Sequence, residues 1–286
     1  HSLVGSEMCI RDRSHPKKKF TKVYVDGDLL LYEVSSATQK NVYDIYIDGT
    51  LAYTSSDKRK INEMFKGIDY GFERWVITQP IMAAIDTYKK ILKGYEAMFG
   101  TRRIEVVLTG TGNFREKIAV SREYKGTRSK EKPNNFYKLR EYMIKHGAIE
   151  VDGEEADDYL SYNTYMKYDT VAVTSDKDAL NTPSYIYNTR KEELIYVSKE
   201  DADKNFWTQV ITGDSVDCIP GLPAHGKVWA EENLEGLTTY EELERKVGLA
   251  YACHPAIDDP EAYLTEQATL LWMRRKPEEE WHIGLN

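Results

Sequence analysis

The sequence predicts an α/β protein in which a mainly parallel central sheet is flanked by helices. Along the chain the spacing of apolar residues switches repeatedly between two and 3.6, which is typical of strands and helices that follow one another. Several short apolar segments also end at carboxylates, and parallel strands bring their carboxyl ends to one edge of a sheet. The 286 residues, 41% of them hydrophobic and 30% charged, suffice for one large domain with a helical addition or two modest domains.

The elements follow from local patterns. Residues 23–26 form the first predicted strand, and a helix follows from Leu29. Residues 42–53 alternate around Asp48-Gly49, a dipeptide that suits a tight turn between antiparallel strands, so they predict a β-hairpin. Ser198, with Asp201 three residues later, predicts a helix start. The further predicted strands are residues 104–108, 148–151, 170–174, 185–187 and 194–197; the predicted helices are 80–99, 135–145, 156–166 and 199–212, with a mostly helical remainder.

The N-terminal residues, the cysteines and the apolar segments together indicate the cellular compartment. Residues 1–13 read as a translated adapter or assembly junction, so we predict a non-native leader there and leave it out of the fold. Cys9, Cys218 and Cys253 are far apart and predict reduced thiols. No apolar run approaches the roughly eighteen residues of a membrane span, and no secretory segment is visible. We therefore expect a cytoplasmic protein.

Opposite charges are segregated along the chain. The net charge is −8, but residues 114–145 contain ten Lys or Arg against four Glu, a local balance of +6 that leaves −14 for the remainder. A basic strip beside an acidic pocket suits chemistry on a polyanion such as nucleic acid. The alternative is an ordinary exposed helix rich in lysine.

Three acidic clusters stand out, at residues 154–158, 176–178 and 214–217, each near an apolar segment. Two carboxylates about 4 Å apart repel by roughly 4 kcal/mol at an effective dielectric near 20, so convergence of these clusters requires cations. Oxygen ligands favour Mg²⁺ or Mn²⁺ over zinc, which prefers His and Cys. Asp214 and Asp217, three residues apart, are expected to share a face.

The same spacing argument separates the other carboxylates. Asp26 ends the first predicted strand and Asp176 follows a later one, so both are expected at one crevice. Glu155 and Asp158 are three apart near a helix start and are predicted to share a face. Asp157 is predicted to point elsewhere.

With these residues in place, the chain resembles the 5′-nuclease superfamily of flap endonucleases and 5′-3′ exonucleases, most closely the compact bacteriophage type, over residues 23–234. The motifs, in the family's order, are Val25-Asp26-Gly27-Asp28, Glu155-Ala156-Asp157-Asp158, Ser175-Asp176-Lys177-Asp178, and Gly213-Asp214 through Asp217 to Pro220-Gly221. The resemblance implies a PIN-like metal-dependent nuclease core at 14–198, with a basic arch at 110–133, and a helical DNA-binding region of helix-hairpin-helix type at 199–286. A phage protein of this kind would act in the host bacterial cytoplasm.

The resemblance also implies site residues. Two Mg²⁺ ions, for which Mn²⁺ would substitute, would be held by Asp26, Glu155, Asp157, Asp158, Asp176, Asp178, Asp214 and Asp217. Lys125 and Arg128 of Tyr124-Lys125-Gly126-Thr127-Arg128 would reach the scissile phosphate as catalytic residues. The predicted DNA contacts are Tyr32, Arg115, Arg122, Tyr124, Lys130, Gly221, Gly226 and Lys227. Among these, Tyr32 would stack on the terminal base or, alternatively, be a core residue. The turn from Gly221 to Lys227 would bind duplex backbone with the help of K⁺.

Two departures from the family pattern affect the site. The family ends its next strand with Asp-Gly, whereas this chain has Thr109-Gly110, so one expected carboxylate is missing. The turn element, which reads Pro223-Ala224-His225-Gly226-Lys227, is one residue short.

The sequence thus predicts a monomeric, Mg²⁺-dependent 5′-3′ exonuclease or flap endonuclease. It would hydrolyse phosphodiester bonds at DNA 5′ ends, in duplex, flap or RNA-DNA hybrid, during replication or primer removal. Three alternatives stay open. A haloacid-dehalogenase-like phosphatase would use Asp26-Gly27-Asp28 and Thr109, a non-catalytic nucleic-acid-binding module would explain the lost carboxylate, and a PIN-type ribonuclease would share the core.

Overall fold

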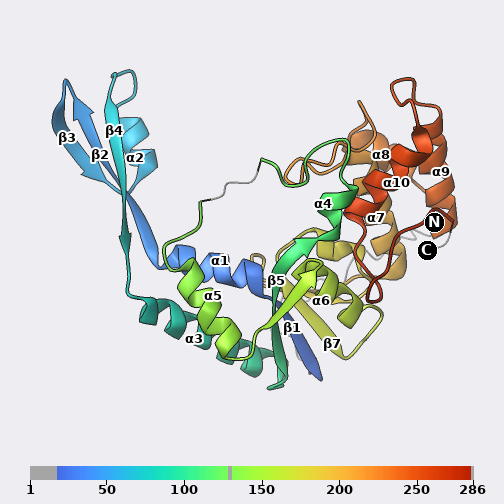
Figure 1. Cartoon of the computed structure of the whole chain (residues 1–286), viewed down its shortest axis with the longest axis horizontal. Coiled ribbons are helices and arrows are strands. Elements are labelled where there is room, and N and C mark those ends of the chain that lie inside the picture. Colours follow the sequence, from blue (N-terminus) through green and yellow to red (C-terminus); the bar gives the residue numbers. More distant parts are fainter. Residues whose placement is uncertain (1–17, 128–130, 285–286) are drawn as a thin grey trace, which may run out of the picture. The chain divides into compact units, whose positions relative to one another are not determined.

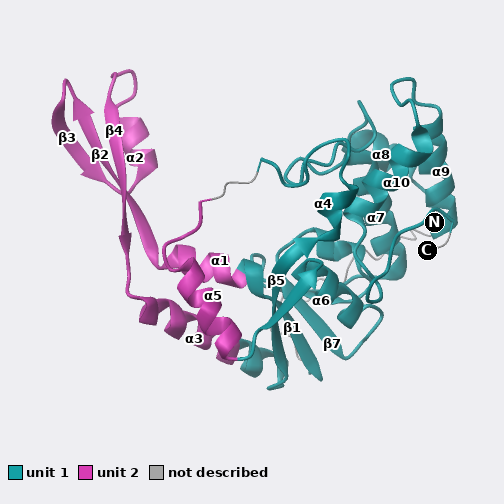
Figure 2. Cartoon of the chain, viewed as in Figure 1, with its two compact units in different colours: residues 1–29, 94–130, 147–286 teal, residues 30–93, 131–146 magenta. Residues whose placement is uncertain are grey.

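The computed structural model describes residues 18–127 and 131–284, which form two compact units (Figure 2). Among the described residues, 18–29, 94–127 and 147–284 make up the first unit, and 30–93 and 131–146 make up the second. The predicted leader at 1–13 and two predicted site residues, Arg128 and Lys130, lie outside the described residues. The basic strip, residues 114–145, is divided between the units.

The first unit is built on a six-stranded sheet with the order β6-β5-β1-β7-β8-β9 (Figure 1). Its strands are β1 (Lys22–Asp26), β5 (Ile104–Asn113), β6 (Ile149–Gly153), β7 (Thr170–Thr174), β8 (Tyr185–Asn188) and β9 (Glu193–Tyr196). All neighbours are parallel except β8 and β9. The central strands are rich in fully buried β-branched residues such as Val23, Val107 and Val171, as expected for strands covered on both faces. The predicted fold class is confirmed.

The helices of the first unit are α4 (Phe114–Ile118), α6 (Ala156–Thr164), α7 (Lys199–Thr212), α8 (Lys227–Asn233), α9 (Tyr240–Ala252) and α10 (Pro260–Leu271), with the 3₁₀ helix η1 (Asp178–Asn181). Helix α6 packs on the sheet, whereas α7 to α10 have a second core of their own. Ser198 caps α7 by accepting the Asp201 N–H, as predicted. Trp207, Tyr251 and Trp281 are buried where these helices pack. Helices α7 to α10 share a unit with the parallel sheet, so residue 198 marks a change of secondary structure, not of compact unit.

The second unit contains a small antiparallel sheet with the order β3-β2-β4. Its elements are most of α1 (Gly27–Ala37) and α3 (Ile81–Phe99), together with β2 (Gln39–Ile47), β3 (Thr50–Ser55), α2 (Lys58–Met64), β4 (Gly71–Thr78) and α5 (Phe136–Lys145). The predicted hairpin is β2-β3, and its turn residues Asp48 and Gly49 have φ values of 49° and 76°, as a primed turn requires. The sequence analysis did not predict β4 or α2.

Regular structure continues into the region predicted to form the basic arch, because β5 extends to Asn113 and α4 follows directly. Among the described residues, no helix combines the length and apolar composition of a bilayer crossing.

Candidate metal centre

The carboxyl end of β1 places Asp26 in a buried position between two neighbouring segments. One carboxylate oxygen accepts the Leu29 N–H at 2.9 Å, and the other accepts the Thr174 hydroxyl at 2.9 Å. Burial, together with the charges of Asp28 and Asp176, raises the pKa of Asp26 to about 7. Asp26 therefore lies in a site with excess negative charge, the electrostatic condition that a cation relieves.

Asp157 belongs to the same edge, contrary to its predicted direction. Burial raises the pKa of Asp157 well above its ordinary value, and the charges of Asp26 and Asp176 raise it further. Asp157 follows the helix start at Ala156, whose N–H donates to the Thr109 hydroxyl at 2.9 Å. This bond fixes the beginning of α6 against the end of β5.

Asp158 is the residue that points elsewhere. Its side chain is 0% exposed, and its oxygens accept the two terminal nitrogens of Arg115 at 2.5 and 2.8 Å. It also accepts the Glu155 N–H at 3.3 Å as part of a capping box. The prediction of Asp158 as a metal ligand is wrong, because a fully buried carboxylate already paired with a guanidinium has no need of a second cation.

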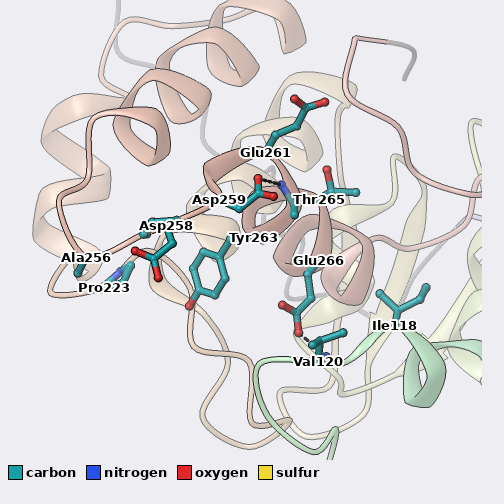
Figure 3. Close-up of a pocket in the computed structure, with 12 residues that line it drawn as sticks. Ile118, Val120, Pro223, Ala256, Asp258, Asp259, Glu261, Tyr263, Thr265 and Glu266 are labelled. Atoms are coloured by element: carbon teal, nitrogen blue, oxygen red, sulfur yellow. Dashed lines mark hydrogen bonds between the residues drawn. The ribbon is translucent and has the colours of Figure 1, made fainter.

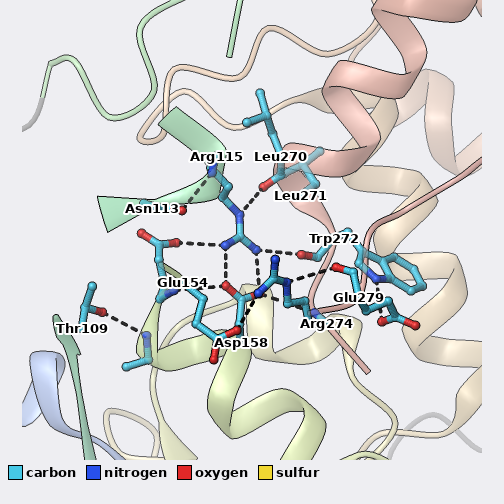
Figure 4. A network of polar contacts seen from close by, with 12 residues as sticks. Thr109, Asn113, Arg115, Glu154, Asp158, Leu270, Leu271, Trp272, Arg274 and Glu279 are labelled. Carbon is cyan, nitrogen blue, oxygen red and sulfur yellow. Dashed lines mark hydrogen bonds and ion pairs between the residues drawn. The ribbon is translucent and has the colours of Figure 1, made fainter. Parts of the chain in front are cut away.

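Arg115 is the centre of this buried network (Figure 4). Its Nε donates to the Leu270 carbonyl at 3.0 Å and one Nη to the Trp272 carbonyl at 2.7 Å. Burial disfavours its charge, but Asp158 raises the pKa of Arg115 above its ordinary value. Arg115 is only 2% exposed, so its predicted role as a DNA contact is wrong. It instead ties α4 and α6 to the segment that follows α10.

A second carboxylate cluster lies after β7. Asp178, Asp214 and Asp217 each offer an oxygen, and these oxygens lie within 4.8 Å of one another. Burial raises the pKa of Asp178 to about 6, although Gln209 donates to it at 2.7 Å. Three converging carboxylates with hard oxygen donors fit Mg²⁺ or Mn²⁺.

The turn after α7 explains why Asp214 and Asp217 meet. They do not share a helix face; a backbone bridge between Asp214 and Ile219 closes a tight loop instead. Gly213 has φ 68°, and a Cβ there would lie 2.3 Å from the Ile219 carbonyl oxygen, so only glycine fits. Although burial opposes it, the ion pair with Lys177 at 2.8 Å lowers the pKa of Asp214.

Tyr124 and Lys125, in the segment predicted to form the arch, contact carboxylates at the α6 start and in the turn after α7. The Tyr124 hydroxyl lies 3.0 Å from a Glu155 oxygen and 3.2 Å from an Asp217 oxygen. Lys125, in the left-handed conformation at φ 56°, pairs with Glu155 and lies 3.7 Å from an Asp217 oxygen. Burial works against the ionised form, but Lys125 and Arg115 hold the pKa of Glu155 below its ordinary value. Arg122 is exposed nearby in the chain.

The predicted turn element is only partly available to a ligand. Gly221 is buried, and its N–H donates to the Gln267 side chain at 3.0 Å, so it is not free to bind a phosphate and that prediction is wrong. Gly226 and Lys227 are exposed at the start of α8. Tyr32 is 48% exposed, which excludes the alternative that it is a core residue.

A cavity of about 870 Å³ lies along α10 (Figure 3). Its lining includes Asp258, Asp259, Glu261 and Glu266, and none of the described lining residues is Lys or Arg. Such a surface repels phosphate. The Glu266 carboxylate accepts the N–H groups of Val120 and Ser121 at 2.7 Å each, so this region anchors the start of the arch.

No family model matches the chain. An alignment of 103 positions, which covers 31% of the chain, is 33% identical to DNA polymerase I of Rhizobium leguminosarum and spans only 10% of that protein. Among solved structures, the bacteriophage T5 D15 flap endonuclease, in a pseudo-enzyme-product complex with DNA and metal ions, matches at a TM-score of 0.50 and 13% identity, over 88% of this chain and 86% of that one. This chain has the 5′-nuclease fold.

Two other structures match more weakly. The T5 D15 protein co-crystallized with metal ions has a TM-score of 0.48 and 14% identity, over 88% of both chains. The catalytic core of Rad2 in complex with DNA substrate has a TM-score of 0.46 and 13% identity, over 96% of this chain and 86% of that one.

Within the 5′-nuclease fold, the sequence analysis assigned no role to several residues of the site. Lys177 neutralises Asp214, and Thr174 positions Asp26. Asp28 accepts the Thr109 N–H at 3.0 Å. The sequence contained a pattern that could have indicated Asp28 and Lys177, since both lie inside motifs shared with the 5′-nuclease superfamily. Nothing in the spacing indicated Thr174, because its partner is 148 residues away.

Proposed function

We propose that this protein is a divalent-metal-dependent nuclease that hydrolyses phosphodiester bonds at DNA 5′ ends, as a 5′-3′ exonuclease and flap endonuclease. One observation carries the proposal. Carboxylates from the end of β1, the start of α6, the β7-η1 turn and the turn after α7 gather beside the base of the arch, and Lys125 pairs with one of them. The 5′-nuclease fold supports it, as does the similarity to the T5 D15 flap endonuclease, whose structure contains DNA and metal ions.

Two metal positions are proposed. Asp26, Asp157 and Asp176 would contribute to one, and Asp178, Asp214 and Asp217 to the other, with Glu155 between them. Bound Mg²⁺ or Mn²⁺ would supply water activation and stabilisation of the leaving oxygen. Burial and neighbouring charges raise the pKa of Asp26 and of Asp178, so binding of the ions should release protons.

The chain's own cations have distinct proposed roles. Lys125 would hold the scissile phosphate and balance the charge that develops on it, because it already lies among the carboxylates. Arg122 would contact the backbone. Arg128 and Lys130 keep the predicted roles of catalytic residue and DNA contact. Gly226 and Lys227 would contact duplex DNA, and the turn that contains them would bind K⁺. The protein would act as a monomer in the cytoplasm, in replication or primer removal.

A gel with 5′-labelled duplex, flap and RNA-DNA hybrid substrates tests the proposal. Cleavage is expected with Mg²⁺ and not with EDTA, and Asp176→Asn should abolish it. The matched control is Asp152→Asn. The Asp152 carboxylate accepts the Thr111 N–H at 2.7 Å and is not one of the proposed metal ligands. Binding without cleavage would favour the non-catalytic module, and cleavage of RNA alone would favour the PIN-type ribonuclease. Rapid release of nitrophenol from p-nitrophenyl phosphate, with the DNA left intact, would favour the phosphatase.

Single-turnover kinetics test the role of Lys125. Lys125→Ala should slow cleavage at saturating DNA by roughly 10²- to 10³-fold, typical of a lost electrostatic donor. Arg122→Ala, the control within the arch, should weaken binding and reduce its salt dependence without changing that rate. A normal single-turnover rate for Lys125→Ala would contradict the assignment.

A further inference from the structure

The second half of β5 contains no carboxylate, whereas the pattern of the 5′-nuclease superfamily has Asp-Gly at Thr109-Gly110. Residues 109–113 contain no Asp or Glu. Thr109 cannot substitute for one simply, because its hydroxyl accepts the Ala156 N–H at 2.9 Å and so serves the start of α6. The next strand carries Asp152, but this exposed residue accepts the Thr111 N–H and hydroxyl at 2.7 and 2.9 Å.

Asp28 reaches the end of β5 from the other side. It is the second residue of α1, and one of its oxygens accepts the Thr109 N–H at 3.0 Å. The close approach depends on Gly27, where a Cβ would lie 2.4 Å from the Val107 carbonyl oxygen. The α1 start is therefore packed directly on β5, and the Asp28 carboxylate lies at Thr109, where β5 itself has no carboxylate.

Asp28 also lies close to the first metal position. It follows Asp26 by two residues, and Thr109, whose N–H it accepts, holds the start of α6 by accepting the N–H of Ala156, the residue before Asp157. A residue that only held the backbone of Thr109 would not need a charge, since an amide oxygen would accept the same N–H. A carboxylate beside Asp26 adds repulsion that a bound cation would turn into attraction.

We infer that Asp28 is an additional oxygen donor for the metal ion at Asp26, supplying from α1 the carboxylate that β5 does not provide. The inference rests on the proposed function, because it assumes a metal at this edge of the sheet. It explains how a chain with Thr109 in place of a carboxylate retains the ligand set.

Calorimetric titration of the full chain with MnCl₂, without DNA, tests this inference. Asp28→Asn keeps an oxygen acceptor for the Thr109 N–H but removes the charge, and it should weaken Mn²⁺ binding at one site by roughly tenfold or more. Asp152→Asn is the matched control, because it changes an aspartate with the same type of backbone contact on the neighbouring strand, and it should bind Mn²⁺ like the wild type.

Relocating the carboxylate sharpens the test. The double variant Asp28→Asn, Thr109→Asp should regain Mn²⁺ affinity, since an aspartate at 109 can still accept the Ala156 N–H. The melting temperature of Asp28→Asn in EDTA should equal or exceed that of the wild type. Wild-type Mn²⁺ affinity in Asp28→Asn would overturn the inference while leaving the nuclease proposal intact, whereas a wild-type protein that binds no Mn²⁺ would overturn both.

Discussion

Two adjacent aspartates divide the α6 start into regions with opposite electrostatics. Asp157 lies among like charges at the metal edge, where burial and the charges of Asp26 and Asp176 favour its neutral form. Asp158 lies in the Arg115 network, where both of its oxygens accept guanidinium nitrogens. At Asp157 burial and the neighbouring carboxylates outweigh the favourable charge of Lys125, whereas Asp158 has a counterion built into the fold.

The difference shows how charge is divided between function and stability. A carboxylate whose charge is balanced by the protein contributes to folding, and breaking such a buried pair is costly. A carboxylate kept among like charges reduces the stability of the metal-free protein and becomes favourable only with a cation. The two regions should therefore respond oppositely to the same substitution.

The largest effect is expected at Asp157. Asp157→Asn should reduce cleavage on the order of 10³-fold, because it removes a proposed metal ligand. Its melting temperature in EDTA should not fall, because one of the repelling charges is gone. Cleavage and melting should be measured on the same preparation. A variant that cuts within tenfold of the wild-type rate at saturating Mg²⁺ would break the comparison.

The next effect concerns stability. Asp158→Ala should lower the free energy of unfolding by about 3 to 5 kcal/mol, because it leaves Arg115 buried without its partner. The double variant Asp158→Leu, Arg115→Met should recover much of this loss, since neither charge is then buried alone. Urea unfolding measures both. If Asp158→Ala were as stable as the wild type but lost Mn²⁺ binding, Asp158 would belong to the metal edge.

A smaller effect, dependent on pH, is expected at Asp26. Burial raises its folded-state pKa to about 7, above the ordinary value of 3.8, so between these values the folded state binds more protons than the unfolded state. The metal-free protein should therefore lose stability as pH rises from about 4 to about 7, by on the order of 1 to 4 kcal/mol from this group.

Denaturation in EDTA at pH 5 and pH 8 measures this dependence. Asp26→Asn should be more stable than the wild type, and its advantage should be larger at pH 8. Asp152→Asn is the control, because hydrogen bonds from Thr111 lower the pKa of Asp152 and it stays ionised over this range. An advantage of Asp26→Asn that does not grow with pH would contradict the assigned pKa.

The smallest effect is expected at Tyr32, which belongs to neither region. Loss of base stacking in Tyr32→Ala should cost about 1 to 3 kcal/mol, seen as slower cleavage and a less uniform cut position, and Tyr32→Phe should retain both. Because Tyr32 is 48% exposed, the melting temperature should change little. A folded Tyr32→Ala protein that cuts at the usual place and rate would remove Tyr32 from the proposed site.

Local patterns were sufficient for much of the fold. The parallel sheet follows from alternating periodicities, the β2-β3 turn from Asp48-Gly49, and the α7 start from Ser198, because each depends on neighbours within a few residues. The small β4 strand was not predicted, since its residues are mostly exposed or half-buried on an edge and carry no clear core pattern.

The roles of individual carboxylates depended on contacts between distant segments. Helical spacing predicted that Asp158 lies on the metal face and that Asp157 points elsewhere. The ion pair between Arg115 and Asp158, which are 43 residues apart, shows instead that Asp158 is the residue directed away from the metal. Gly221 has the conformation of a turn glycine, and only its contact with Gln267, 46 residues away, shows that its N–H is used inside the fold. The sequence by itself determined that Asp26 and Asp176 lie at one edge of the sheet, because parallel strands end at the same edge. Only the tertiary structure decided which of them are neutralised by the protein, because a counterion can come from any segment that packs nearby.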